Sequence, residues 1–145
     1  IVDYAHTPDA LENCLRAIHD ILSSRKQGRV ITIFGCGGDR DRGKRLLMGE
    51  IASHLSNITI ITSDNPRNEN PQSIIDEILK GVSSGREVHT EPDRRKAIVQ
   101  GLQLAKEGDI ILVAGKGHET YQVFGNERVH FDDREEVETF IRTSQ

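Results

Sequence analysis

The stretch Ser63-Asp64-Asn65-Pro66-Arg67 offers an acid, an amide and a guanidinium close together along the chain. It follows an apolar run at 58–62 whose β-branched residues are typical of a buried strand. Asp64 can face an ammonium group, and Arg67 can bind a carboxylate with both arms of its guanidinium. These residues therefore predict a loop that binds a zwitterion, although an ordinary polar turn fits the same pattern.

A second candidate is the glycine-rich stretch from Gly35 to Arg45. It fails as a dinucleotide fingerprint, because Arg40 stands where the third glycine is needed. It also fails as a P-loop, because Arg45 replaces the Ser or Thr that would hold magnesium. We expect its basic residues to meet an anionic group, with a solvated run of charges as the alternative; they are Arg40, Arg42, Lys44 and Arg45.

A third glycine loop, Gly115-Lys116-Gly117-His118-Glu119, follows the apolar run at 109–114. Its glycines allow a ligand to approach the main chain, and Glu119 supplies a second acid. Lys116 and His118 offer cationic or proton-transferring groups whose roles the sequence leaves open.

Near the start of the chain, Tyr4, His6 and Asp9 surround the beginning of a helix that Thr7 can cap and Pro8 can open. They fit ordinary capping, or a polar rim that touches a nucleotide or phosphate.

The elements that must position these residues alternate between strands and helices. Apolar periodicity predicts helices at 8–27, 46–55, 71–82, 94–105 and from Asp132 or Asp133 onward. It predicts strands at 29–34, 58–62, around Val88 near a sheet edge and at 109–114, and a hairpin formed by 121–124 and 128–131. We therefore predict the α/β class: a Rossmann-like, mostly parallel sheet with helices on both faces, with the hairpin near the C-terminus adding antiparallel pairing. The three loops should meet at one edge of that sheet.

Length and composition limit the function classes. The 145 residues fit one domain, and a net charge of −4 argues against nucleic-acid binding. No apolar run reaches the roughly 18 residues that cross a membrane, so we expect no membrane association. Cys14 and Cys36 lack metal-ligand spacing and suit a reducing cytoplasm, and we expect no metal site. The start at Ile1 suggests a piece of a longer protein.

Four motifs in order resemble the carboxyl-terminal domain of the Mur ligases, and within that family the ligases that add meso-diaminopimelate to UDP-N-acetylmuramoyl-L-alanyl-D-glutamate. They are Asp-Tyr-Ala-His-Thr-Pro-Asp from Asp3, Gly-Cys-Gly-Gly-Asp-Arg-Asp from Gly35, Asp-Asn-Pro-Arg from Asp64, and Gly-Lys-Gly-His-Glu from Gly115. The resemblance covers essentially all of 1–145 and implies one domain of a three-domain enzyme of peptidoglycan synthesis. It implies that ATP and Mg²⁺ are bound mainly by the central domain, that the amino-terminal domain takes the UDP sugar, and that this domain is inactive alone and holds no catalytic residue.

The resemblance also implies site residues. The family's diaminopimelate contacts match Arg40, Asp64, Asn65, Pro66, Arg67, Gly115 and Glu119 in this chain. Tyr4, His6 and Asp9 match the segment that approaches ATP.

On this pattern, Arg40 and Arg67 take the two carboxylates of diaminopimelate, while Asp64 and Glu119 take its distal ammonium. Lysine lacks the second carboxylate and would leave Arg67 unpaired, so Arg67 is the expected discriminator. Where the family usually has Pro after Lys-Arg, this chain has Leu46, which bears on the rigidity of the second loop.

Two alternatives remain at this point. The chain could come from a lysine-adding ligase of the same family, or it could be a free-standing Rossmann-like module for a nucleotide or phosphorylated metabolite.

Overall fold

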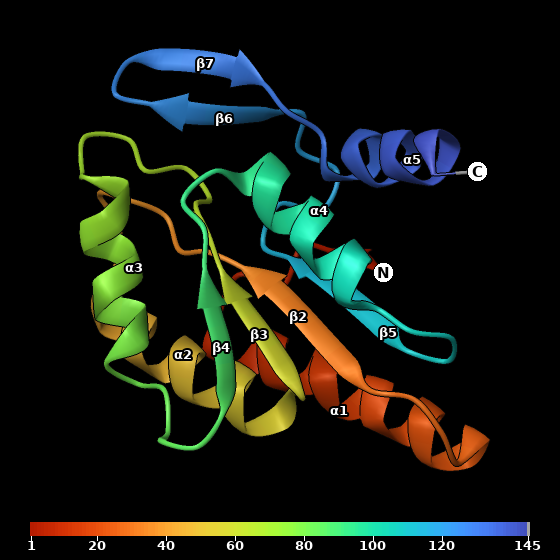
Figure 1. Cartoon of the computed structure of the whole chain (residues 1–145). Helices are drawn as coiled ribbons and strands as arrows, with labels where there is room; N and C mark the ends of the chain where they lie inside the picture. Colours follow the sequence, from red (N-terminus) through yellow and green to blue (C-terminus); the bar gives the residue numbers. More distant parts are fainter. Residues whose placement is uncertain (145) are drawn as a thin grey trace.

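The computed structural model describes residues 1–144, and its centre is a parallel five-stranded sheet (Figure 1). The strands lie in the order β1-β5-β2-β3-β4. Their bounds are β1 Val2–Asp3, β2 Val30–Phe34, β3 Ile58–Ile61, β4 Glu87–Thr90 and β5 Ile110–Ala114. The chain builds outward from β2 to β3 and β4, then returns to add β5 on the other side of β2. This reversal makes the carboxyl ends of β2 and β5 the point where such sheets bind ligands.

Alternating residues of the central strands fill two cores. Val30 and Phe34 of β2 face one core, whereas Ile31 and Ile33 face the other, and all four side chains are fully buried. Burial on both faces explains why these strands read as continuous apolar runs.

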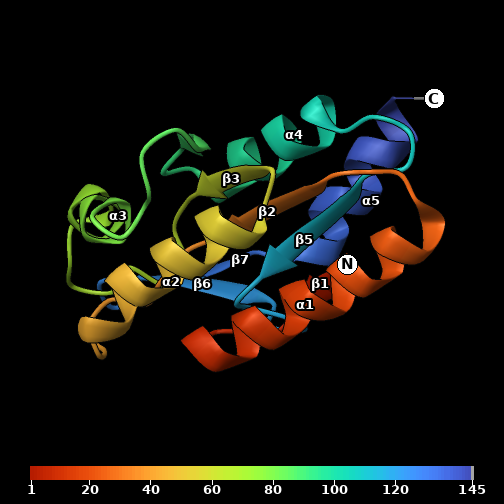
Figure 2. The same ribbon diagram turned by 90° about the horizontal axis from the view of Figure 1, so that it is seen from below.

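Helices cover both faces of the sheet, as expected. They are α1 Pro8–Arg25, α2 Gly43–Leu55, α3 Pro71–Leu79, α4 Arg94–Leu104 and α5 Asp133–Thr143. The first three pack on the core that contains Phe34, and α4 and α5 pack on the opposite core. Figure 2 shows α1 and α4 on opposite sides of the sheet.

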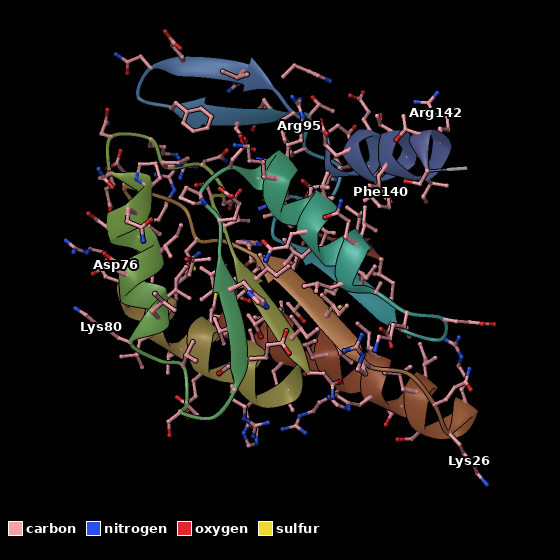
Figure 3. The ribbon with its side chains drawn as sticks, viewed as in Figure 1. Lys26, Asp76, Lys80, Arg95, Phe140 and Arg142 are labelled. Carbon is pink, nitrogen blue, oxygen red and sulfur yellow. The ribbon has the colours of Figure 1, made fainter. Side chains whose placement is uncertain are left out.

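The helix ends follow local chemistry. Thr7 Oγ1 accepts a hydrogen bond from the N–H of Ala10 (3.2 Å), and Pro8 occupies the first turn, so α1 begins where the sequence predicts. At the far side, Arg95 of α4 forms an ion pair with Glu136 of α5 (2.9 Å); Figure 3 labels Arg95 near the start of α4.

The predicted antiparallel hairpin is present as β6 Tyr121–Phe124 and β7 Glu127–His130, which pair with each other in a separate two-stranded sheet. An isolated β-bridge between Phe124 and Arg67 joins the hairpin to the main domain. Helix α2 begins at Gly43, earlier than the predicted start at Leu46. The side chain of Asp41 accepts from the Gly43 N–H (2.9 Å) in a turn at this point, and Arg42 at the N-cap position makes no side-chain capping bond.

The position of β4 at an edge agrees with the sequence. Among the described residues, no helix is long and apolar enough to cross a membrane.

Candidate functional site

A cavity of about 480 Å³ lies beyond the carboxyl ends of the parallel strands. Each of the three predicted loops contributes to its wall, as does the segment before α1. The lining residues are Tyr4, His6, Thr7, Gly35, Cys36, Gly37, Arg40, Asp41, Lys44, Asp64, Asn65, Arg67, Gly115 and Glu119. The structure therefore brings together loops that are far apart in the sequence, because parallel strands all end at the same sheet edge.

The charges of this wall are balanced. Three cationic side chains, Arg40, Lys44 and Arg67, share it with three acidic ones. The acidic side chains are Asp41, Asp64 and Glu119. A wall of both signs suits a ligand that carries carboxylates and ammonium groups, since each ligand charge can meet an opposite one.

Within the central motif, Asn65 acts mainly as an internal support. Its side chain is buried, and its Oδ1 accepts from Lys116 Nζ (3.1 Å) and from the N–H of Val123 (3.1 Å). Gln122 Nε2 donates to the carbonyl of Asp64 (2.7 Å). Strand β6 thus holds the loop from behind and leaves Asp64 facing the cavity.

Arg67 is held by both its backbone and its side chain. Its φ of +52° is unusual for a residue with a side chain, and its N–H donates to the carbonyl of Val123 (3.0 Å). Its Nη1 donates to the carbonyl of Gly38 (2.8 Å), so the guanidinium lies against the glycine loop.

Pro66 does not line the cavity and instead packs against Gly38. A Cβ at Gly38 would lie 1.8 Å from the Pro66 carbonyl oxygen, so only glycine fits there. This close approach explains why the loop after β2 has a glycine at position 38.

The basic stretch after β2 divides into two groups, which corrects the expectation that all four cations face a ligand. Arg40 and Lys44 line the cavity. Arg45 is fully buried and forms ion pairs with Glu69 (2.9 Å) and Glu77, while Arg42 pairs with Glu77 (2.8 Å) on the surface. The hydrogen bond from Arg45 lowers the pKa of Glu69 from 4.5 to about 2.

Cys36 lines the cavity but is a poor nucleophile. Burial raises the pKa of its thiol to about 12, and its Sγ contacts Met48 Sδ at 3.7 Å. We therefore assign it to packing.

The residues of the loop after β5 differ in how deeply they are buried. Gly115 has a φ of +114° and lies at the cavity wall, and Glu119 is partly exposed there. Lys116 between them is fully buried behind the wall. His118 is exposed, with its ring centroid 6.3 Å from that of Tyr4.

At the rim formed by the segment before α1, Tyr4 and His6 line the cavity with ring centroids 4.5 Å apart. Lys44 Nζ donates to the carbonyl of His6 (3.1 Å) and so joins this rim to α2. Asp9 is exposed on the first turn of α1 and does not line the cavity.

Sequence reasoning missed three buried supports of this site: the depth of Lys116, the role of Gln122, and Arg94. Arg94 donates to the carbonyl of Ser63 (3.0 Å), just after β3, and to that of Ala114 (3.2 Å), the last residue of β5. Their sequence contexts, a glycine loop around Lys116 and a charged run from Asp93 to Lys96 around Arg94, gave no signal that these side chains are buried. Within residues 1–144, no group of three His, Cys, Asp or Glu side chains could hold a metal ion.

Comparison with known proteins identifies a family and several relatives of this chain. The model of the family "Mur ligase, glutamate ligase domain" matches residues 1–117. The UDP-N-acetylmuramoyl-L-alanyl-D-glutamate--2,6-diaminopimelate ligase of Thermosynechococcus vestitus is 53% identical over 142 residues, which are 98% of this chain and 28% of that protein. Ligase 1 of the same name from Clostridium acetobutylicum is 50% identical, again over 98% of this chain and 28% of its own length.

A solved structure of a ligase with this name superposes with a TM-score of 0.90 and 46% identity, covering 99% of this chain and 29% of that one. The chain therefore spans only 28% of the length of these two ligases.

Proposed function

Because this chain belongs to the Mur ligase family, with the glutamate ligase domain model matching residues 1–117, we propose that it is the amino-acid-binding domain of an ATP-dependent diaminopimelate ligase. The whole enzyme would join meso-diaminopimelate to UDP-N-acetylmuramoyl-L-alanyl-D-glutamate in peptidoglycan synthesis. Support comes from relatives named for that reaction at 50–53% identity.

The observation that carries the proposal is the mixed-charge cavity at the strand ends. Diaminopimelate has two carboxylates and two amino groups. We propose that Arg40 and Arg67 bind the carboxylates, and that Asp64 and Glu119 bind the distal ammonium. The remaining amine is then left to react.

The proposed reaction has two steps. ATP transfers its γ-phosphoryl group to the D-glutamyl carboxylate, which forms an acyl phosphate and ADP. The free amine of diaminopimelate then attacks the acyl carbon, a C–N bond forms, phosphate leaves and the amine loses a proton. The contribution of this domain is positioning, because holding the amine near the acyl carbon replaces a slow bimolecular encounter.

The nucleotide belongs mainly to another domain of the same enzyme. The P-loop pattern at Gly38–Lys44 ends at Arg45, which the structure buries in ion pairs with Glu69 and Glu77. We therefore propose that the central domain binds ATP and Mg²⁺ and that Tyr4 and His6 approach the nucleotide when the domains close. Asp9, also expected at this rim, is exposed in the first turn of α1 and does not line the cavity. An enzyme that consumes ATP and a UDP-linked precursor would work in the cytoplasm.

The first test measures substrate choice in the full-length enzyme, as kcat/KM for meso-diaminopimelate and for L-lysine. We expect the wild type to prefer diaminopimelate, because lysine would leave the Arg67 guanidinium without a carboxylate. Arg67→Ala should lower kcat/KM for diaminopimelate about 10²- to 10³-fold and leave the low value for lysine within about threefold.

Arg142→Ala is the matched control, since Arg142 lies on the outer surface of α5 (Figure 3). This variant should leave kcat/KM unchanged for both meso-diaminopimelate and L-lysine. A wild type that prefers lysine, or an Arg67→Ala variant that keeps the preference for diaminopimelate, would contradict the proposal and favour a lysine-adding ligase or another ligand.

A further inference from the structure

Lys116 is a charged residue with no exposed surface, placed directly behind the cavity. It does not line the cavity, yet its neighbours Gly115 and Glu119 do. Gly115 and Gly117, with φ values of +114° and +55°, let the chain turn on both sides of it. A buried ammonium costs several kcal/mol unless it is paired, so its surroundings should show what it does.

Three oxygen-bearing side chains and one aromatic ring surround the ammonium. Its Nζ lies 3.1 Å from Asn65 Oδ1, 3.4 Å from Asp64 Oδ1 and 3.6 Å from Glu119 Oε1. The ring of Tyr121 lies below it, 5.5 Å from Nζ to the ring centroid. Every oxygen in this set belongs to a residue of the cavity wall, and two of them come from the acids proposed for the distal ammonium.

The remaining carboxylate oxygens are left for the cavity. Within residues 1–144, Asp64 Oδ2 and Glu119 Oε2 form no hydrogen bond, whereas Asp64 Oδ1 and Glu119 Oε1 are the atoms nearest to Lys116. Two carboxylates that share a small site repel each other. A cation between them removes that repulsion and fixes which oxygen of each acid points inward.

Lys116, Asp64 and Glu119 together carry a net charge of −1. A single ammonium group of a ligand would neutralise this charge. We propose that Lys116 is a positioning and specificity-determining residue: it holds Asp64 and Glu119 in place and sets the charge of their subsite to match one ammonium group of the amino acid. This inference rests on the proposed function.

The experiment uses the full-length enzyme and two neutral variants. Lys116→Met removes the charge and the donors with little change of volume, and Lys116→Gln retains an N–H donor for Asn65. Lys80→Met, at the exposed C-cap position that follows α3 (Figure 3), is the control.

The KM for diaminopimelate should rise about 10- to 100-fold in both Lys116 variants, while the KM values for ATP and for the UDP-linked substrate stay within about twofold. A merely structural role would instead lower kcat or affect all three KM values together.

A double-mutant cycle with Glu119→Gln supplies the second readout. If Lys116 acts through the acid pair, Lys116→Met should raise the KM less than about threefold when Glu119 is already neutral. Full additivity of the two changes would overturn the inference, as would an unchanged KM in both Lys116 variants. Loss of folding in both variants would also overturn it, because Lys116 would then be a structural residue.

Failure of this inference can be told apart from failure of the proposed function. A wild-type enzyme that does not ligate diaminopimelate contradicts the proposed function itself. A wild type that does so, with Lys116 variants that match the control, contradicts only the role of Lys116.

Discussion

At the scale of single residues, the ion pair between Arg94 and Asp133 supports the site from beneath. Both side chains are fully buried, and the guanidinium binds the carboxylate through two hydrogen bonds of 2.8 and 2.7 Å. The same guanidinium donates to the carbonyls of Ser63 and Ala114. One side chain therefore ties the ends of β3 and β5 to the start of α5.

We expect Arg94→Met to lower the free energy of unfolding by about 3–5 kcal/mol, since it leaves the Asp133 carboxylate buried without a partner. Urea denaturation measures this value. Adding Asp133→Leu to Arg94→Met should recover part of the loss, because the unpaired charge is then gone. Arg16→Met, which breaks an exposed pair with Glu12, should cost less than about 1 kcal/mol. A loss below about 1 kcal/mol for Arg94→Met would show that the pair is dispensable.

At the scale of elements, a buried ionic cluster ties the loop after β2 to the loop before α3. Arg45 donates to Glu69 and to the carbonyl of Gly37 (3.0 Å), and Glu69 accepts from the N–H of Asp39 (2.9 Å). These contacts set the distance between the loops that carry Arg40 and Arg67. The cluster thus positions the proposed carboxylate-binding residues without touching a ligand.

This cluster predicts a pH dependence of stability. The folded-state pKa of Glu69 lies near 2, below its ordinary value of 4.5, so its contribution is complete above pH 4.5 and is lost as the pH falls toward 2. Glu69→Gln should lower the free energy of unfolding at pH 7 by about 1–2 kcal/mol, allowing for screening of a partly exposed carboxylate. The same variant should show a smaller decrease in the free energy of unfolding between pH 5 and pH 2 than the wild type.

Chemical denaturation at a series of pH values between 2 and 7 gives this profile. Glu127→Gln, on the hairpin, is the control, since Glu127 forms no ion pair within the described part of the chain. If the free energy of unfolding fell with pH equally in Glu69→Gln and in the wild type, Glu69 would not be the cause of the decline.

The predicted antiparallel hairpin is confirmed as β6 and β7. Its two strands form a separate sheet that backs the Asp64–Arg67 loop through Val123 and Gln122. The tight turn and the alternation of side chains are local features, so the hairpin could be predicted. Its partner could not, because nothing within the hairpin determines where it docks.

At the scale of the whole molecule, the cavity carries charged groups that we propose for an amino acid. The Gly38–Lys44 stretch lacks the hydroxyl residue that a P-loop needs for magnesium and ATP. We therefore expect the 145-residue chain alone to release no phosphate from ATP when all substrates are present, whereas the full-length enzyme does. A phosphate-release assay on both proteins tests this, and turnover by the short chain at the full-length rate would contradict it.

The sequence by itself determined the elements and the three loops that form the cavity. Strands such as Ile58–Ile61 and the capped start of α1 depend on residues close in the chain, and parallel strand ends meet at one edge whatever the loop composition. Only the tertiary structure decided which charged side chains face that cavity. Arg40 and Arg45 look equivalent in the sequence, yet one lines the wall and the other is buried, since Glu69 and Glu77 arrive from a distant segment. The same holds for Lys116: whether a charge is buried depends on the partners that folding brings to it.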